Sequence, residues 1–198
     1  ATLPCAAVTA WSALMVKGDL RPGESVLILG AGGVSIFALQ LAKIAGARVL
    51  AITSSEEKAA ELRRLGADAV HNYKTDPAWE DWALAQTDGR GVDKVVEVGG
   101  PDTLNRSLKA VRFGGHVAMI GVLSGTEGQI QTVQIVRKSI RLDGVYVGSR
   151  AMFADLLRCI TQHQMRPVLD STFELANTVE ALKRMESGLH IGKVVITC

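Results

Sequence analysis

Residues 25–35 read SVLILGAGGVS, a short apolar run followed by glycines and then by a helical pattern. Gly30 permits a tight turn after a strand, and Gly32 lets a ligand approach the backbone closely. The N–H groups of Gly33 and Val34 would then point at a phosphate from a helix N-terminus, where the helix dipole favours anions. This context predicts a dinucleotide-binding turn; the alternative is a purely structural glycine turn.

Two positions near this turn refine the prediction. The third position of the glycine fingerprint is Ser35, which is small enough for close helix–strand packing. The second predicted strand ends at Thr53, followed by Ser54 and Ser55, where a site specific for NAD would place a carboxylate. Lys58 follows one helical turn later, so a hydroxyl-lined pocket with a nearby cation suits a 2′-phosphate. The alternative is an N-cap and a solvated lysine.

Short β-rich runs alternate with helical patterns along most of the chain, which indicates an α/β fold. Apolar strands separated by helices are typical of a parallel sheet covered on both faces. We expect a Rossmann-type, doubly wound, six-stranded parallel sheet with a short C-terminal αβ return segment. The expected strands are 25–29, 48–53, 69–72, 94–98, 115–120 and 141–147; the expected helices are 33–45, 56–65, 79–87, 102–111, 133–138 and 151–163; the tail adds strands 172–175 and 193–197 around a helix at 177–187.

Composition excludes several classes of protein. The chain has 198 residues, of which 47% are hydrophobic and 21% charged, with a net charge of +2. This apolar content excludes a disordered chain, and the balanced charge predicts neither a nucleic-acid nor a membrane partner. The cysteines, Cys5, Cys159 and Cys198, form no CxxC pair, so we expect reduced thiols and a cytoplasmic protein. Because the chain starts without Met inside a helical pattern, we also expect a domain cut from a longer protein.

Several ordered motifs resemble the medium-chain dehydrogenase/reductase superfamily of zinc-type alcohol dehydrogenases and quinone oxidoreductases. They are LPCAAVTAW, GAGGVS, AITSSEEK, RLGAD followed by NY, and GVYVGSR, and they run through most of the chain. The resemblance implies an NADP-binding Rossmann domain at 1–170, with an N-terminal helix, and a return segment at 171–198. It also implies that the GroES-like catalytic domain of the family is absent from this chain.

The resemblance further implies cofactor contacts at strand ends, where open α/β sheets bind ligands. Thr9 would lie near the nicotinamide, and Ile120, Gly121 and Leu123 would lie over the nicotinamide ribose. The carboxamide would be held by backbone groups at Val145 and Val147. The other contacts expected are Gly30, Gly32, Gly33 and Val34 at the pyrophosphate, and Thr53, Ser54, Ser55, Lys58, Tyr73, Val98 and Gly99 around the adenosine ribose or its 2′-phosphate.

Metal and catalytic residues are harder to assign. Cys5 is in register with a zinc ligand of the alcohol dehydrogenases, but catalytic zinc needs three protein ligands. The four histidines do not pair at ligand spacing. We therefore expect no metal site and name no catalytic residue; Cys5 is then a small buried thiol.

The function expected from the resemblance is hydride transfer between NADP(H) and an alcohol, a carbonyl or a quinone as the small-molecule substrate. The alternatives are an enoyl reductase domain and a non-enzymatic NADP-binding protein of the same superfamily. A methyltransferase is disfavoured because it would place an acidic residue near Thr53. We also expect a homodimer through the edge of the sixth strand, near 141–147, unless the tail covers that edge.

Overall fold

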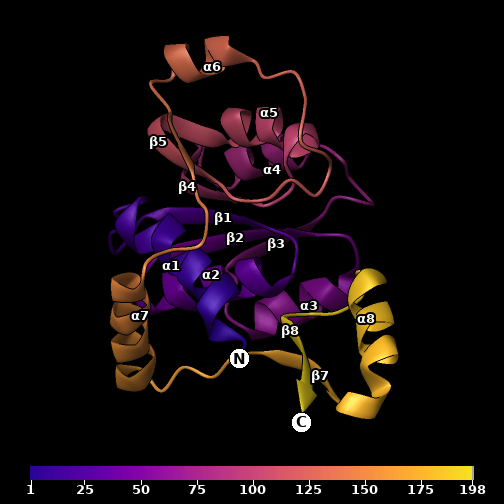
Figure 1. Ribbon diagram of the computed structural model, residues 1–198. Helices are drawn as coiled ribbons and strands as arrows, with labels where there is room; N and C mark the ends of the chain where they lie inside the picture. Colours follow the sequence, from indigo (N-terminus) through magenta and orange to yellow (C-terminus); the bar gives the residue numbers. More distant parts are fainter. Residues whose placement is uncertain (198) are drawn as a thin grey trace.

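A computed structural model describes residues 1–197 and shows the expected parallel sheet. Its six strands follow the order β3-β2-β1-β4-β5-β6, and every neighbouring pair is parallel. The order reverses between β1 and β4, which is the point where doubly wound sheets bind ligands. The α/β Rossmann-type fold is therefore confirmed (Figure 1).

The elements alternate along the chain as the sequence predicts. A helical N-terminal segment comprises η1 (Leu3–Ala7), α1 (Val8–Trp11) and η2 (Ser12–Val16); the sheet and its helices are β1 (Ser25–Leu29), α2 (Gly33–Ile44), β2 (Arg48–Thr53), α3 (Glu56–Arg64), β3 (Ala69–Asn72), α4 (Trp79–Ala85), β4 (Val92–Glu97), α5 (Pro101–Ala110), β5 (Val111–Met119), α6 (Thr132–Arg137), β6 (Arg141–Gly144) and α7 (Arg150–Gln162); the tail is β7 (Leu169–Glu174), η3 (Leu175–Asn177), α8 (Thr178–Glu186) and β8 (Lys193–Thr197).

The core lies in two layers, one on each face of the sheet. The first layer joins Phe37 and Leu41 of α2 to the N-terminal helices, and the second packs Trp79 and Leu104 against the opposite face. The central strand β1 is buried along its whole length. In Figure 1, α1, α2, α3 and α7 lie on one side of the sheet and α4, α5 and α6 on the other. Burial on both faces explains why the central strand β1 is almost entirely apolar.

Four strands differ in their bounds from the prediction. The fourth strand runs Val92–Glu97 rather than 94–98, and the first tail strand runs Leu169–Glu174 rather than 172–175. The fifth strand begins at Val111 rather than near Gly115, and a register irregularity lies between Val92 and Lys94 of its neighbour. The sixth strand ends at Gly144, and Val147, which was predicted to belong to it, has a left-handed φ of 52° that a strand residue does not adopt.

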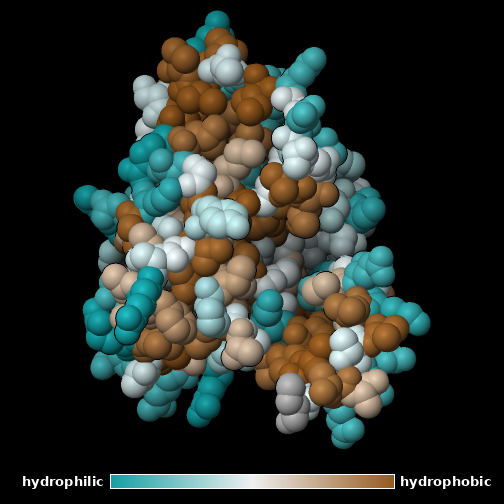
Figure 2. Space-filling model, in the orientation of Figure 1, coloured by the Kyte–Doolittle hydropathy of each residue, from teal (hydrophilic) through white to brown (hydrophobic). Residues whose placement is uncertain are grey.

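The tail folds as a separate small unit beside the sheet. Strands β7 and β8 form their own two-stranded parallel sheet, with α8 between them in sequence. This sheet does not cover β6; the tail reaches the main sheet at a parallel bridge between Gly32 and Gly192. Apolar side chains gather over the tail in Figure 2, and Val179, Leu182 and Met185 of α8 are each more than half exposed. Among the residues described, no helix is long and apolar enough to cross a membrane.

Candidate functional site

The main pocket lies where the carboxyl ends of β1, β2, β4 and β5 meet the glycine turn. Its volume is about 400 Å³. The residues that line it come from several segments of the chain: Leu29, Gly30, Ala31, Gly32, Gly33, Val34 and Ser35; Thr53, Ser54 and Lys58; Tyr73; Val98; Ile120, Gly121 and Leu123; and Gly188 with His190. Most of the residues predicted to bind the cofactor are therefore brought together.

The glycine turn has the geometry that its sequence predicts. Gly30 has a φ of 75°, a conformation that favours glycine. Gly32 is the N-cap of α2, and a Cβ on it would meet no atom within 4 Å, so the turn has open space beside it. Ser35, at the third fingerprint position, donates its hydroxyl to the Leu29 carbonyl at 2.6 Å. The serine therefore ties the helix to the end of β1, and the departure from glycine leaves the turn intact.

Thr53, at the end of β2, presents an unsatisfied polar atom in this pocket. The residue is 1% exposed, and its Oγ1 has no hydrogen-bond partner within residues 1–197. A buried hydroxyl without a partner costs folding free energy, so this atom is strained by its surroundings in the same way as any unsatisfied polar group. Ser54 lines the pocket as well, whereas the Ser55 hydroxyl accepts the N–H of Lys58 and caps α3. The structure thus assigns Ser55 the capping role that its sequence context also allowed.

Lys58 lines the pocket, but its ammonium has a partner in the tail. It donates to the carbonyl of Gly188. Burial lowers the pKa of Lys58, and the nearby Arg184 lowers it further. The lysine is therefore a half-buried cation at the pocket wall rather than the solvated helix lysine that was the alternative.

A second hollow of about 360 Å³ adjoins the main pocket and shares Leu29, Gly30, Tyr73, Val98 and Leu123 with it. Trp79 and Arg106 both line this hollow, and the Arg106 guanidinium lies 4.7 Å from the centroid of the Trp79 ring.

The loop after β4 that borders this second hollow is organised by the buried Glu97. One carboxylate oxygen accepts the N–H groups of Gly99 at 2.7 Å and Gly100 at 3.1 Å, and the hydroxyl of Thr103. The other accepts the Ser107 hydroxyl. Glu97 is not among the predicted residues, although a charged residue inside an apolar strand was the signal for it.

A third hollow of about 450 Å³ continues from Ile120 and Gly121 to the end of β6. Val145 lines it and is buried, and Tyr146 beside it is 98% exposed. Val147 has a left-handed backbone, with a φ of 52°, and its partly buried side chain packs against the hydrophobic core. The main pocket shares lining residues with both other hollows, so the three lie side by side along the carboxyl edge of the sheet. This arrangement is typical of a site for an extended ligand.

Thr9 lies in the N-terminal helix and is buried. Its hydroxyl donates to the Cys5 carbonyl at 2.7 Å, one turn earlier. Because this hydroxyl donates its proton within the helix, it could only accept a hydrogen bond from a ligand. The predicted contact of Thr9 with a nicotinamide stays a prediction.

Two pocket residues, Gly188 and His190, were missed by the sequence analysis. They lie between α8 and β8, in the tail that was expected to be a return segment. No local sequence pattern predicts that these two residues reach the pocket. The bridge between Gly192 and Gly32 brings them there.

The described residues do not assemble a zinc site. Cys5 is exposed, so the expected buried thiol is wrong, and within residues 1–197 no three His, Cys, Asp or Glu side chains are grouped to hold a metal. Cys198 lies outside the described residues. A single surface thiol does not meet the three-ligand requirement of a catalytic zinc site.

Comparison with known proteins decides the family. The model of the family described as "Zinc-binding dehydrogenase" matches residues 33–162. The chain belongs to this family. This confirms the resemblance to the medium-chain dehydrogenase/reductase superfamily, of which the chain is the cofactor-binding domain.

Individual members of this dehydrogenase family match almost the whole chain. A zinc-type alcohol dehydrogenase-like protein of Schizosaccharomyces pombe is 43% identical over 99% of this chain and 58% of its own length. A putative alcohol dehydrogenase of Sinorhizobium meliloti has a solved structure with a TM-score of 0.95 at 40% identity, covering 100% of this chain and 57% of its own.

Two further solved structures carry cofactor names. An NAD-dependent alcohol dehydrogenase is 33% identical with a TM-score of 0.92, over 100% of this chain and 57% of its own. A 2-octenoyl-CoA carboxylase reductase, in complex with NADP and 2-octenoyl-CoA, is 26% identical with a TM-score of 0.91, over 100% and 48%. This chain thus spans about half the length of the proteins it matches.

Proposed function

We propose that this chain is the NADP(H)-binding domain of an oxidoreductase. The domain comprises residues 1–170, and residues 171–198 form a segment that returns toward the family's catalytic domain. The observation that carries the proposal is the pocket at the glycine turn, which contains the unpartnered Thr53 hydroxyl and no carboxylate at the end of β2. When bound, the nicotinamide supplies the hydride chemistry.

The residues present fit a dinucleotide. The open side of Gly32 admits the pyrophosphate to the N-terminus of α2. Thr53, Ser54 and Lys58 would hold the adenosine ribose and its 2′-phosphate, and Tyr73 would border them. The remaining proposed contacts are Val98 and Gly99 at the adenosine, Ile120, Gly121 and Leu123 at the nicotinamide ribose, and the backbone of Val145 and Val147 with Thr9 at the nicotinamide.

For the complete protein we propose reduction or oxidation of an alcohol, a carbonyl or a quinone. The alcohol dehydrogenases among the matching proteins support the first two. A second candidate is reduction of an enoyl thioester, which is supported by the reductase bound to NADP and 2-octenoyl-CoA. Turnover assays of the complete protein with both substrate classes distinguish them.

Calorimetric titration of the protein with NADPH and with NADH tests the cofactor assignment. We expect NADPH to bind more tightly, roughly 100-fold if two hydrogen bonds reach the 2′-phosphate. Thr53→Asp should reverse this preference, because a carboxylate repels the 2′-phosphate and binds ribose hydroxyls. Thr132→Asp, at an exposed position in the first turn of α6, is the matched control. Equal affinity of the wild-type protein for the two cofactors would contradict the assignment.

Assembly and location are further parts of this proposal. Strand β6 ends the main sheet, so its outer edge is available for pairing with β6 of a second copy in a two-fold dimer. Sedimentation of the protein as a monomer would contradict the dimer. A reducing compartment, the cytoplasm, is proposed because Cys5 and Cys159 are in no disulfide.

A further inference from the structure

Residues 188–193, which we call the strap, cross from α8 to β8 directly beside the glycine turn. The N–H of Gly192 donates to the Ala31 carbonyl at 2.9 Å. The Lys193 side chain lies so close to Gly33 that a Cβ on Gly33 would be 2.8 Å from its Cδ. At the other end of the strap, the Gly188 carbonyl accepts from Lys58. The strap is thus joined to both sides of the pocket.

The buried carboxylate of Asp170 on β7 fixes the middle of the strap. It accepts the N–H of Ile191 at 3.0 Å, next to His190. The same carboxylate is held by both arms of the Arg184 guanidinium, at 2.8 and 2.9 Å. A backbone anchored on each side of His190 limits where its ring can point.

The His190 ring lines the pocket with its two nitrogens in different surroundings. Nδ1 is shielded from solvent and has no hydrogen-bond partner in the part of the chain that the structure describes. Within residues 1–197, Nε2 is not among the buried atoms without a partner and takes part in no hydrogen bond, so we infer that Nε2 is the nitrogen that faces the pocket. A neutral imidazole carries one proton, and a proton on Nδ1 would bury an N–H without an acceptor.

Charges around His190 act against a second proton. Lys58 of α3, Arg184 of α8 and Lys193 of β8 are cations, and Asp170 of β7 is the opposing anion. Burial lowers the pKa of His190, and the three cations add to this effect while Asp170 counters it. The ring is therefore neutral near pH 7, with its single proton best placed on Nε2.

We propose that His190 donates a hydrogen bond from Nε2–H, as a neutral imidazole, to a pyrophosphate oxygen of the bound dinucleotide. The inference rests on the proposed function, since it assumes a dinucleotide in this pocket. The pyrophosphate is favoured over the 2′-phosphate because Gly192, two residues from His190, pairs with Gly32 of the turn where that group would bind. The tail is then part of the binding site rather than only a connection to another domain.

Calorimetric titration with NADPH and NADH at pH 7.5 tests this donor through a matched pair of variants. The amide nitrogen of glutamine reaches the place of Nε2, whereas that of asparagine ends near Nδ1. We expect His190→Asn to weaken the binding of both cofactors about tenfold, as loss of a hydrogen bond to a charged group predicts. His190→Gln should stay within about threefold of wild type. His163→Asn, at an exposed histidine that ends α7, should change nothing.

Repeating the titrations at pH 7.0 and 8.5 in two buffers of different ionisation enthalpy tests the neutral state. We expect the ratio of wild-type to His190→Asn affinity to stay constant and no proton to be taken up by His190. A ratio that grows toward pH 7.0 with proton uptake, equal affinities of all variants, or a loss confined to NADPH would each overturn the inference. Failure of the wild-type protein to bind either cofactor would instead overturn the proposed function, and this inference with it.

Discussion

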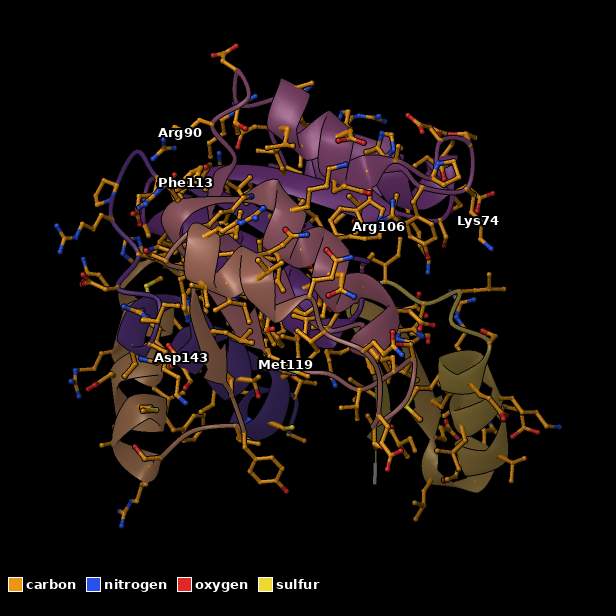
Figure 3. The ribbon with its side chains drawn as sticks, turned by 90° about the horizontal axis from the view of Figure 1, so that it is seen from above. Lys74, Arg90, Arg106, Phe113, Met119 and Asp143 are labelled. Carbon is orange, nitrogen blue, oxygen red and sulfur yellow. The ribbon has the colours of Figure 1, made fainter. Side chains whose placement is uncertain are left out.

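Asp93 at the amino edge of the main sheet and the pocket residues Thr53 and His190 at its carboxyl edge differ in how their polar atoms are satisfied, although Glu97 at the carboxyl edge is as fully bonded as Asp93. At the amino edge, Asp93 is saturated: it accepts the N–H and hydroxyl of Ser25 at 2.9 and 2.8 Å, two bonds from Arg90, and one from Arg112 at 2.5 Å. At the carboxyl edge, the Thr53 hydroxyl and the His190 Nδ1 have no partner among the residues described. Figure 3 marks the two ends of β5 with Phe113, beside Arg90, and Met119.

This contrast separates stability from binding. Where charges satisfy one another inside the chain, removing one partner leaves the others unpaired and costs folding free energy. Where polar groups and glycines are open, a change should alter affinity for a ligand and leave folding nearly intact. Three substitutions test whether the two edges divide their roles in this way.

Asp93→Ala should have the largest effect, on stability alone. The side chain of Asp93 is 3% exposed, and its loss leaves the buried Ser25 N–H without its acceptor and removes the ion pairs of Arg90 and Arg112. We expect the free energy of unfolding to fall by about 2–4 kcal/mol in urea denaturation, with unchanged dinucleotide affinity. Arg21→Ala, which removes the exposed ion pair with Asp19 and leaves the left-handed Asp19 in place, should leave the unfolding curve nearly unchanged. A large loss of affinity in folded Asp93→Ala would contradict the division.

His116 on β5 should make stability depend on pH. Burial, with Arg141 adding, lowers the pKa of His116 from 6.5 to about 4 against the opposing effect of Asp143, whose Oδ2 lies 3.0 Å from Nε2. The unfolded chain binds this proton near pH 6.5 and the folded chain near pH 4, so this contribution is complete above pH 6.5 and lost as pH falls to 4.

Over that window, wild type should lose about 1–3 kcal/mol more than His116→Gln in chemical denaturation. The same comparison with His163→Gln should show no difference, because His163 is exposed. Parallel pH profiles for wild type and His116→Gln would show that His116 does not carry the effect.

Gly32→Ala should give the smallest free-energy change, and only at the carboxyl edge. Gly32 has a φ of −74°, which alanine adopts readily, and its Cβ would meet no protein atom. The methyl group would instead occupy the space needed by the pyrophosphate. We expect affinity for NADPH and NADH to fall about tenfold by calorimetry, ~1.4 kcal/mol, with the unfolding midpoint unchanged. Normal affinity in this variant would mean that the turn is purely structural.

Most of the main sheet is predictable from the amino-acid sequence because its signals are local. Apolar runs mark the central strands β1 and β2, the alternation with helical patterns locates the other four, and the fingerprint at Gly30 locates the pocket at the end of β1. The errors are local too: valine favours strands, so Val147 is predicted to extend the sixth strand, but its positive φ depends on packing that no propensity contains.

The part of the candidate site contributed by the tail could not be predicted in this way. His190 and Gly188 enter the pocket through hydrogen bonds that join the strap to Ala31, Lys58 and Asp170, partners distant in sequence. The spacing of Lys58 on a helix predicts a phosphate-binding role, but the carbonyl that it meets belongs to the strap. Contacts of this kind are set by tertiary docking and leave no periodic pattern.

The pairing of Gly32 with Gly192 joins an early turn to one of the last segments of the chain. During synthesis, the six strands of the main sheet leave the ribosome before the strap does, so the sheet has all its residues while one wall of the pocket is still missing. A nascent or C-terminally clipped chain would therefore hold its core yet bind dinucleotide poorly. Under the proposed function, dinucleotide binding would therefore require that translation has passed the strap.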